Sequence, residues 1–473
     1  MSSRCGIFFL RVKLFLEYFA EFLSLAFGLL LCGYNDIRRT KMNPQAESLN
    51  KTIKEESEVV FELLSEKGKQ IFFPKKGILS QTEEAKGKKI NATIGSAIEN
   101  DGTPMCLDSI ENLVKLSRNN IVSYAPGFGN AEIRKKWLEM MYKKNPTLKD
   151  KSVSNPAATA ALTHALAVLG YLFINEGDSL YLPDLYWENY DLIFVNAYGT
   201  VFDTFSLFNG NSFAIDSFRE KIMSGVPGVR KILLNFPNNP TGYTPLRGEV
   251  EQIISAIKES AESGNKILVV LDDAYFNLVY EEGVERQSLF AYLCDIHENV
   301  LAVKVDGPTK EDYVWGFRVG FITYGIKNGS RKLYDALEQK TGGTIRGSIS
   351  NAPNISQSLL LSAYNSPDYD LEKESKYNVL KHRYETVKTV FAQNTEYSEY
   401  FSPMPFNSGY FMCIKLAEGI DVEAVRHILL DDFSTGVINL DNIIRIAFSA
   451  VPTDLIPELF SNMYLACKKA AQK

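Results

Sequence analysis

Three side chains that can do chemistry follow short apolar runs of the sequence, where strands would end. Asp272 ends the run KILVVLD, and Lys310 follows the run VLAVKVD after a Gly-Pro-Thr turn. Asn239 lies in PNNPTG, directly after KILLNF. Ligands of open parallel sheets bind outside the carboxyl ends of the strands. We therefore expect a carboxylate, an amine and an amide to meet at one edge of a sheet.

Three further side chains belong to the same segments. Tyr275 lies three residues after Asp272, and Trp187 follows the run SLYLP. Arg318 lies eight residues beyond Lys310, between the apolar residues of WGFRVGF. This context predicts a buried arginine, which usually holds a carboxylate or a phosphate through two hydrogen bonds.

Each residue alone has a simpler interpretation. Asp272 could cap a helix or join a structural ion pair, and Lys310 could be a solvated surface lysine. PNNPTG could be only a turn, and Trp187 could be core packing. Together, however, they supply an amine for an aldehyde, an acid for a protonated pyridine nitrogen and an arginine for a phosphate. Pyridoxal 5'-phosphate requires these partners.

The elements that must position these residues alternate along the chain. Near-continuous apolar runs indicate strands buried on both faces: SLYLP (179–183), KILLNF (231–236), KILVVLD (266–272), VLAVKVD (300–306) and VGFITYG (319–325). Helical patterns separate them: one begins near Gly129, one follows Ala160, and one runs from Arg247 towards a stop at Gly264. This alternation predicts an α/β fold with a mainly parallel sheet.

The pattern changes after Ser366, which suggests a second, smaller domain. A long charged helix leads to strands around GYFMCIKL and IIRIAFSA and then to a last helix, which is typical of an α+β arrangement. We expect four parts: an apolar extension (1–41), an arm with part of the small domain (42–120), a large domain (121–365) and a C-terminal small domain (366–473).

The apolar extension permits three interpretations. It could be a signal or anchor segment, an amphipathic helix, or sequence upstream of a true start at Met42. Its uncharged run from Phe22 to Tyr34 is shorter than the roughly 20 residues of a membrane-spanning helix. We favour a start at Met42, where the composition changes abruptly, and expect a cytoplasmic protein without membrane attachment.

Composition and charge exclude several classes of protein. Of 473 residues, 45% are hydrophobic and 23% charged, as in globular proteins. The net charge of −6 without a basic block argues against nucleic-acid binding. The six cysteines form no CxxC pair and the four histidines no HExxH motif, so we expect neither a metal site nor a disulfide scaffold.

From about Asn91 to the C-terminus, the chain resembles the fold-type I, class I/II aminotransferases, and within them the aspartate and aromatic aminotransferases. The resemblance rests on several motifs in family order, including NNPTG, the segment with Asp272 and Tyr275, the Lys310–Arg318 spacing and IIRIAFS. It implies a seven-stranded-type large domain with a smaller α+β domain. It also implies an aminotransferase with pyridoxal 5'-phosphate.

The resemblance assigns five residues to the cofactor ring. Lys310 corresponds to the lysine that forms the Schiff base, and Asp272 to the partner of the pyridine nitrogen. Asn239 and Tyr275 correspond to the residues that reach the phenolic oxygen. Trp187 corresponds to the aromatic residue that stacks on the ring.

It assigns four residues to the cofactor phosphate. Arg318 corresponds to the phosphate-binding arginine. Ala158 and Thr159 lie in AATAA (157–161), where the family has a small-residue turn that opens a helix. Tyr124, in SYAPGFGNAEIR, corresponds to a tyrosine that reaches the phosphate of the partner subunit.

The substrate residues follow in the same way. Arg445 in IIRIAFS corresponds to the arginine that holds the substrate α-carboxylate, and Gly95 in NATIGSA lies close to the ligand. Arg346, in the loop TIRGSISNAP, corresponds to an arginine that crosses the dimer interface to a distal carboxylate. Asn239 and Trp187 also contact the substrate. Tyr124 and Arg346 together imply a homodimer with shared sites.

The implied reaction moves an amino group from an L-amino acid to a 2-oxo acid such as 2-oxoglutarate, with ping-pong kinetics. A buried Arg346 left unpaired would be costly, which favours aspartate or glutamate. Phe128, Tyr186 and Phe276 could instead line an aromatic pocket or simply pack in the core. A β-lyase, a decarboxylase and a cofactor-binding regulator are the alternatives on the same scaffold.

The sequence departs from the family pattern at three places. Alanines replace glycines in the phosphate turn, and Gly307 stands where a phosphate-binding serine is frequent. Leu185 replaces a proline before the ring-stacking aromatic residue. The first two departures predict weaker contacts to the phosphate, and none removes a catalytic group.

Overall fold

The computed structural model describes residues 42–56, 61, 64, 69, 71, 78–111 and 116–472. The chain divides into two compact units, residues 1–72 and 73–473. In the first unit, helix α2 spans Pro44–Glu56. The expected apolar extension (1–41) lies outside the described residues. None of the helices within the described ranges is long and apolar enough to cross a membrane.

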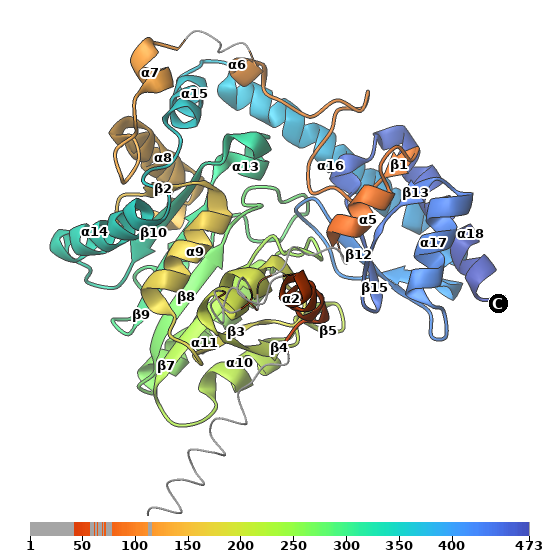
Figure 1. Cartoon of the computed structure of the whole chain (residues 1–473), viewed down its shortest axis with the longest axis horizontal. Helices are drawn as coiled ribbons and strands as arrows, with labels where there is room; N and C mark the ends of the chain where they lie inside the picture. The colour runs from red at the N-terminus through yellow and green to blue at the C-terminus, as the bar shows by residue number, and fades with distance from the viewer. Residues whose placement is uncertain are drawn as a thin grey trace, which may run out of the picture. The chain divides into compact units, whose positions relative to one another are not determined.

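A seven-stranded sheet forms the centre of the second unit (Figure 1). Its spatial order is β2 (Ala157–Thr159), β10 (Gly320–Gly325), β9 (Val300–Asp306), β8 (Lys266–Asp272), β7 (Val229–Asn235), β3 (Ser179–Pro183) and β4 (Val201–Phe205). Strand β10 is antiparallel to β2 and β9, and the remaining pairs are parallel. The predicted α/β class with a mainly parallel sheet is confirmed. Strands β3, β8 and β9 have the predicted bounds.

Both faces of this sheet are buried, as the near-continuous apolar runs predict. In β8, Leu268 and Val270 belong to one hydrophobic core, and Val269 and Leu271 to another. The first core contains residues of the helix α9 (Ala161–Phe173), and the second contains residues of α11 (Arg247–Glu262). Alternate side chains of a strand point to opposite faces, so each strand contributes to both cores.

The other helices of this part are also short segments between strands. They are α8 (Ala131–Lys144), α10 (Ile215–Met223), α12 (Phe290–Leu293), α13 (Pro308–Glu311), α14 (Arg331–Ser348) and α15 (Asn354–Tyr364). Helix α8 begins where Asn130 caps it, because the Asn130 side chain accepts a hydrogen bond from the Glu132 amide. The predicted helices after Gly129, Ala160 and Arg247 therefore correspond to α8, α9 and α11.

The C-terminal part has a four-stranded antiparallel sheet. Its order is β11 (Phe401–Pro403), β12 (Met412–Leu416), β15 (Ile443–Ile446) and β14 (Ile438–Leu440). The helices α17 (Val422–Asp432) and α18 (Ile456–Ala470) accompany it. Helix α16 (Tyr369–Gln393) runs from the neighbourhood of α6 (Asp108–Glu111) to this region (Figure 1). The expected small α+β arrangement is present, and the exact domain boundaries remain a prediction.

A segment from near the start of the second unit joins this C-terminal part. Strand β1 (Ile90–Asn91) pairs in parallel with β13 (Thr435–Gly436). The Gln81 side chain of α5 (Ile78–Glu84) exchanges hydrogen bonds with the backbone of Asn439. The remaining short elements are α7 (Arg118–Val122), β5 (Phe208–Asn209) and β6 (Ser212–Phe213).

Candidate active site

The carboxyl ends of β7, β8 and β9 bring the predicted residues together. Asn235 at the end of β7 is in register with Asp272 at the end of β8, and Asp272 is in register with Val305 of β9. Only Gly307 separates β9 from helix α13, in which Lys310 lies. The arrangement therefore places an acid and an amine at the same sheet edge, as the sequence predicts.

Asp272 is a buried carboxylate held by two donors. The Tyr190 hydroxyl donates to Asp272 Oδ2 at 2.6 Å, and the Ala274 amide donates to Oδ1 at 3.1 Å. Burial raises the pKa of Asp272, while the Tyr190 hydrogen bond and the charge of Lys310 act in the opposite direction. A cation that enters next to this carboxylate would therefore be strongly favoured.

Lys310 is a buried amine whose charge acts on Asp272. Burial lowers the pKa of Lys310 to about 8, although the charge of Asp272 opposes this shift. The ammonium lies over the Tyr275 ring, 5.0 Å from its centre, and the Tyr410 hydroxyl donates to the Lys310 carbonyl at 2.7 Å. A lysine with such a pKa is partly neutral near pH 8 and can accept a proton.

Arg445 on β15 reaches the same place from the small sheet. Its guanidinium donates to Asn239 Oδ1 at 3.3 Å and to the Thr93 carbonyl at 3.1 Å, and lies 4.5 Å over the Phe411 ring. Its Nε is buried without a hydrogen-bond partner. Within the described part of the chain, Arg445 forms no ion pair with a carboxylate. Burial lowers its pKa, so an incoming anion would stabilise the charged guanidinium.

The PNNPTG turn positions Asn239. The Asn239 amide donates to Asn235 Oδ1 at 2.8 Å, which ties the turn to the end of β7. Gly242 has a φ of +71°, and a Cβ at this position would lie 1.8 Å from the Phe411 carbonyl oxygen. Only glycine fits this close approach, which keeps the turn against Phe411, the residue directly before β12.

Tyr275 and Gly95 lie close to Phe411, over which Arg445 lies. Tyr275 is buried between the rings of Tyr410 and Phe411, and burial raises the pKa of its hydroxyl. A Cβ on Gly95 would lie 3.3 Å from the Phe411 ring and 3.9 Å from the Tyr275 hydroxyl. Gly95 therefore lies close to the predicted site.

The predicted phosphate turn is shorter than the sequence suggests. Ala158 and Thr159 belong to strand β2, and Ala160 alone connects it to α9. The Thr159 hydroxyl donates to the Ala161 carbonyl at 3.0 Å, so it already has a backbone acceptor. Ala161 has a φ of +67°, a conformation that favours glycine. The alanine substitutions noted in the sequence thus leave backbone strain at this turn.

Arg318 departs from the expectation of burial. It is exposed, its φ is +54°, and it donates to the Trp315 carbonyl at 3.2 Å. It lies near enough to Lys310 to lower the pKa of that lysine. The adjacent Thr309 hydroxyl is buried without a hydrogen-bond partner. The prediction of a buried Arg318 was wrong: the residue directly follows the short helix Trp315–Phe317 in a left-handed backbone conformation, and it is exposed.

The two residues expected at a subunit interface are exposed. Tyr124 has 90% of its surface accessible. Arg346 is also exposed and donates to Ser350 Oγ at 2.6 Å. The expectation that Arg346 lies in a loop was wrong: residues 344–348 form the last turn of α14, and Ser350 lies beyond its end.

Sequence reasoning missed Tyr190, which contacts the site directly. Its hydroxyl holds Asp272, and its ring contacts Trp187 edge-on, with centres 5.5 Å apart. The spacing of three residues between Trp187 and Tyr190, at the start of a helical turn, is the signal that could have identified it. Two suggested pocket residues have other neighbours: Phe276 lies under Lys304 and Phe128 under Arg134.

Comparisons with known proteins agree with this geometry. The family described as aminotransferase class I and II matches residues 88–462. An aspartate aminotransferase from Bacillus sp. (strain YM-2) is 25% identical over 314 residues, which cover 66% of this chain and 73% of the relative. The crystal structure of an aminotransferase from Anaerococcus prevotii DSM 20548 has a TM-score of 0.75 and 24% identity, and covers 85% of this chain and 98% of its own. For a multiple substrate aminotransferase from Thermococcus profundus the TM-score is 0.71 and the identity 17%, with coverages of 87% and 98%. The chain therefore belongs to the class I and II aminotransferases.

Proposed function

We propose that this aminotransferase takes its amino group from a dicarboxylic or an aromatic L-amino acid and passes it to a 2-oxo acid such as 2-oxoglutarate. The observation that carries the proposal is the buried Arg445, whose Nε has no partner. A guanidinium in this state favours a carboxylate that forms two parallel hydrogen bonds. Every amino acid and 2-oxo acid substrate brings such a group.

The residues present fit pyridoxal 5'-phosphate, which this family uses. The buried Asp272 has hydrogen-bond donors around it but no directly bonded cation in the described chain, which suits a protonated ring nitrogen. The unpartnered Thr309 hydroxyl beside Lys310 suits an additional acceptor. The residues proposed to hold the cofactor are Asp272, Asn239, Tyr275, Trp187, Lys310, Arg318, Ala158, Thr159 and, from the partner, Tyr124.

Lys310 is the proposed base of the reaction. The bound cofactor supplies an electron-poor ring that accepts the electron pair of the substrate Cα–H bond. The Lys310 amine, with its pKa of about 8, takes the proton from Cα at Nζ and delivers it again within the site. Tyr275, whose pKa is raised by burial, keeps its hydroxyl proton and serves as a hydrogen-bond donor.

Arg445 supplies orientation. By holding the α-carboxylate, it fixes the direction of the Cα–H bond relative to Lys310, which is a positioning effect. Since Arg445 also contacts Asn239, one side chain links the substrate position to the PNNPTG turn. The same contacts would serve the incoming 2-oxo acid, which supports a ping-pong order of the two substrates.

The names of similar proteins and the exposure of Arg346 support the proposed substrate range. A relative is named aspartate aminotransferase, and a protein of similar fold is named a multiple substrate aminotransferase. Arg346 is proposed to bind a distal carboxylate across a dimer interface, because it is exposed and forms no ion pair with a carboxylate in the part of the chain that the structure describes. Tyr124, with its 90% accessible surface, would become covered in the same dimer.

A donor screen tests the proposed substrates. Purified enzyme with pyridoxal 5'-phosphate is given each L-amino acid with 2-oxoglutarate, and glutamate formation is measured, with Lys310→Ala as the inactive control. We expect activity with aspartate or with phenylalanine and tyrosine. Release of ammonia or carbon dioxide in place of amino transfer would indicate a lyase or a decarboxylase. Cofactor binding without turnover of any donor would indicate a regulator.

Subunit mixing tests the shared site. Lys310→Ala and Arg346→Ala proteins are each expected to be inactive with aspartate. In mixed dimers, one site combines Lys310 of one subunit with Arg346 of the other. Recovery of roughly a quarter of wild-type aspartate activity in an equimolar mixture is therefore expected. A mixture that stays inactive, although it forms dimers, would exclude a contribution of Arg346 across the interface.

A further inference from the structure

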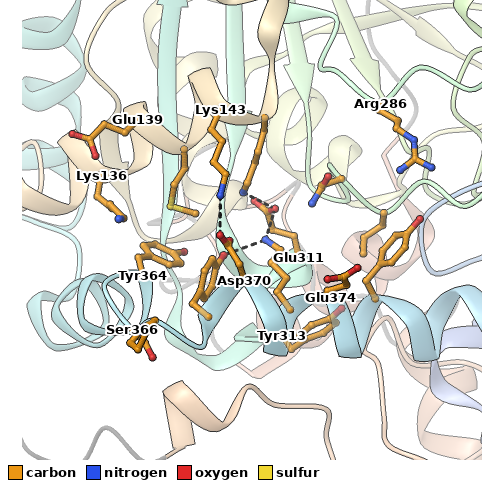
Figure 2. Close-up of a pocket in the computed structure, with 18 residues that line it drawn as sticks. Lys136, Glu139, Lys143, Arg286, Glu311, Tyr313, Tyr364, Ser366, Asp370 and Glu374 are labelled. Carbon is orange, nitrogen blue, oxygen red and sulfur yellow. Dashed lines mark hydrogen bonds and ion pairs between the residues drawn. The ribbon is translucent and has the colours of Figure 1, made fainter.

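A cavity of about 530 Å³ lies apart from the proposed active site (Figure 2). Its walls come from α8, from the first half of α16, from residues 277–286 and from residues 311–313. Asp272, Tyr275, Lys310 and Arg445 are not among its lining residues. The volume is in the range of small-molecule sites in proteins.

Paired charges occupy the middle of this cavity and are already satisfied. Glu311 accepts from Lys144 and from Lys373, each at 2.8 Å, and Lys143 donates to Asp370 at 2.8 Å (Figure 2). Flanking charges lower the pKa of Glu311 to about 2. These ion pairs stabilise the wall of the cavity, and their charges are already neutralised within the protein.

Several polar side chains on the wall of the cavity have no partner within the described ranges, and Lys136 and Glu139 of α8 are among them. The Tyr313 hydroxyl has no hydrogen-bond partner, although the residue is only 3% exposed. The side chains of Asn277, Arg286 and Glu374 also line the cavity. All three residues are exposed, and within the described ranges none of their side chains forms a hydrogen bond or an ion pair. Figure 2 shows Arg286, Glu374 and Tyr313 on the same side of the paired charges.

Arg286 and Glu374 carry the two opposite charges that the ends of an amino acid require. A guanidinium binds a carboxylate through two hydrogen bonds, and a carboxylate binds an ammonium group. A phenol and an amide can each donate and accept. One free cation and one free anion on this side favour a zwitterion over an ion of single sign.

The remaining wall determines the side chain of such a ligand. Met140, Leu278, Tyr364, Tyr369 and Tyr377 line the cavity. The hydroxyls of Tyr364 and Tyr369 donate to Asp312, and that of Tyr377 donates to the Val279 carbonyl, so these rings offer mainly apolar surface. We infer that this cavity is a second amino-acid site, which binds a free α-amino acid with a large apolar or aromatic side chain through Arg286 and Glu374.

Residues that line the cavity lie close in the sequence to the proposed catalytic residues. Glu311 and Tyr313 lie one and three residues after Lys310, and Asn277 lies two residues after Tyr275. Helix α16, which carries Glu374, continues into the C-terminal part. A ligand here contacts both chain segments that carry the proposed catalytic groups without entering their site.

Equilibrium dialysis of radiolabelled L-phenylalanine tests the inference. The enzyme with pyridoxal 5'-phosphate is first treated with aminooxyacetate, which blocks the cofactor aldehyde, so that neither turnover nor the catalytic site contributes to binding. We expect one phenylalanine bound per chain. Arg286→Gln and Glu374→Gln should each weaken binding at least tenfold, and N-acetyl-L-phenylalanine, which lacks the ammonium group, should not compete.

The matched control is Arg247→Gln, because Arg247 is an exposed arginine that does not line the cavity. It should bind phenylalanine as the wild type does. Absence of binding at millimolar phenylalanine, or equal binding by Arg286→Gln and wild type, would overturn the inference. Transamination by the untreated enzyme is measured separately, so a failure of the second site is distinguishable from a failure of the proposed function.

Discussion

Lys304 offers the clearest test of how the ends of β8 and β9 are held. It is fully buried, and its ammonium lies 2.7 Å from Asp273 Oδ2 and 2.8 Å from Asp306 Oδ2. Ser288 donates to Asp273 at 2.6 Å, and Trp137 donates to Asp306 at 3.0 Å. Asp273 follows Asp272, and Asp306 begins the connection to Lys310. Lys304 therefore joins the two segments that carry the proposed catalytic acid and base.

Replacing Lys304 with methionine leaves two buried carboxylates without their cation. Removing one partner of a buried ion pair costs about 3–5 kcal/mol of unfolding free energy. With an unfolding entropy of roughly 2.1 cal/mol/K per residue, a loss of about 4 kcal/mol lowers the Tm of a chain of this length by about 4 °C. Methionine preserves most of the side-chain volume, so a cavity contributes little to this loss.

The loss of unfolding free energy in Lys304→Met should be larger at high pH than at low pH. Burial already raises the pKa of Asp273 to about 6, and the charge of Lys304 opposes that rise. Without Lys304 the pKa rises further, so the folded variant prefers the protonated acid more strongly than the unfolded chain does. The acid therefore destabilises the variant most above its folded pKa, and the deficit relative to the wild type shrinks as the pH falls from that pKa to about 6, where the wild-type acid also takes up its proton.

Thermal unfolding of the wild type and of Lys304→Met at pH 8 and at pH 5 measures both effects. The matched control is Lys221→Met, because Lys221 pairs with Asp203 at the surface and such pairs contribute about 0–1 kcal/mol. A Tm within 1 °C of the wild type at pH 8, or a deficit that does not shrink at pH 5, would refute the reasoning. Adding Asp273→Asn and Asp306→Asn should recover part of the lost stability.

Three further predictions concern the proposed active site. In the apoenzyme, the rate of acylation of the Lys310 amine should be half-maximal near pH 8. Asp272→Asn should lower this pH, because it removes the anion that stabilises the ammonium. A half-maximal rate near pH 10 would contradict the burial argument. Tyr190→Phe removes a 2.6 Å hydrogen bond to Asp272 of about 1.5–3 kcal/mol, so the affinity for pyridoxal 5'-phosphate should fall roughly 10- to 100-fold in a fluorescence titration, and an unchanged Kd would count against this role. Arg445→Gln should raise the KM of every amino-acid donor by about 100-fold or more. Its Tm should fall by less than that of Lys304→Met, because Arg445 loses hydrogen bonds but no ion pair within the described chain. An unchanged KM would refute the proposed clamp.

The strand ends could be predicted because their signal is local. Near-continuous apolar runs determine β3, β8 and β9 to the residue, and the rule that ligands meet the carboxyl ends of parallel strands then brings Asp272 and Lys310 together. Asn239 follows from the same rule, since a turn after β7 has to lie beside the end of β8.

The exposed state of Arg318 and Arg346 could not be predicted in this way. Arg318 lies among apolar residues in the sequence, but that context describes neighbours along the chain and not the direction of the side chain. Arg318 follows a short helix in a left-handed backbone conformation, and Arg346 lies on the outer face of the last turn of α14. Tyr190 was missed because its partner, Asp272, is 82 residues away.

The adjacent acids Asp272 and Asp273 show why long-range contacts decide function. The alternation of a strand sends their side chains in opposite directions, so one dipeptide serves two environments. Lys304 neutralises Asp273, whereas Asp272 receives hydrogen bonds but no direct ion pair. If Lys304 reached Asp272 instead, the acid at the proposed cofactor position would already be compensated and would gain little from a protonated ring nitrogen. Asp272 therefore keeps its charge available for catalysis because Lys304 of β9 pairs with Asp273 and not with Asp272.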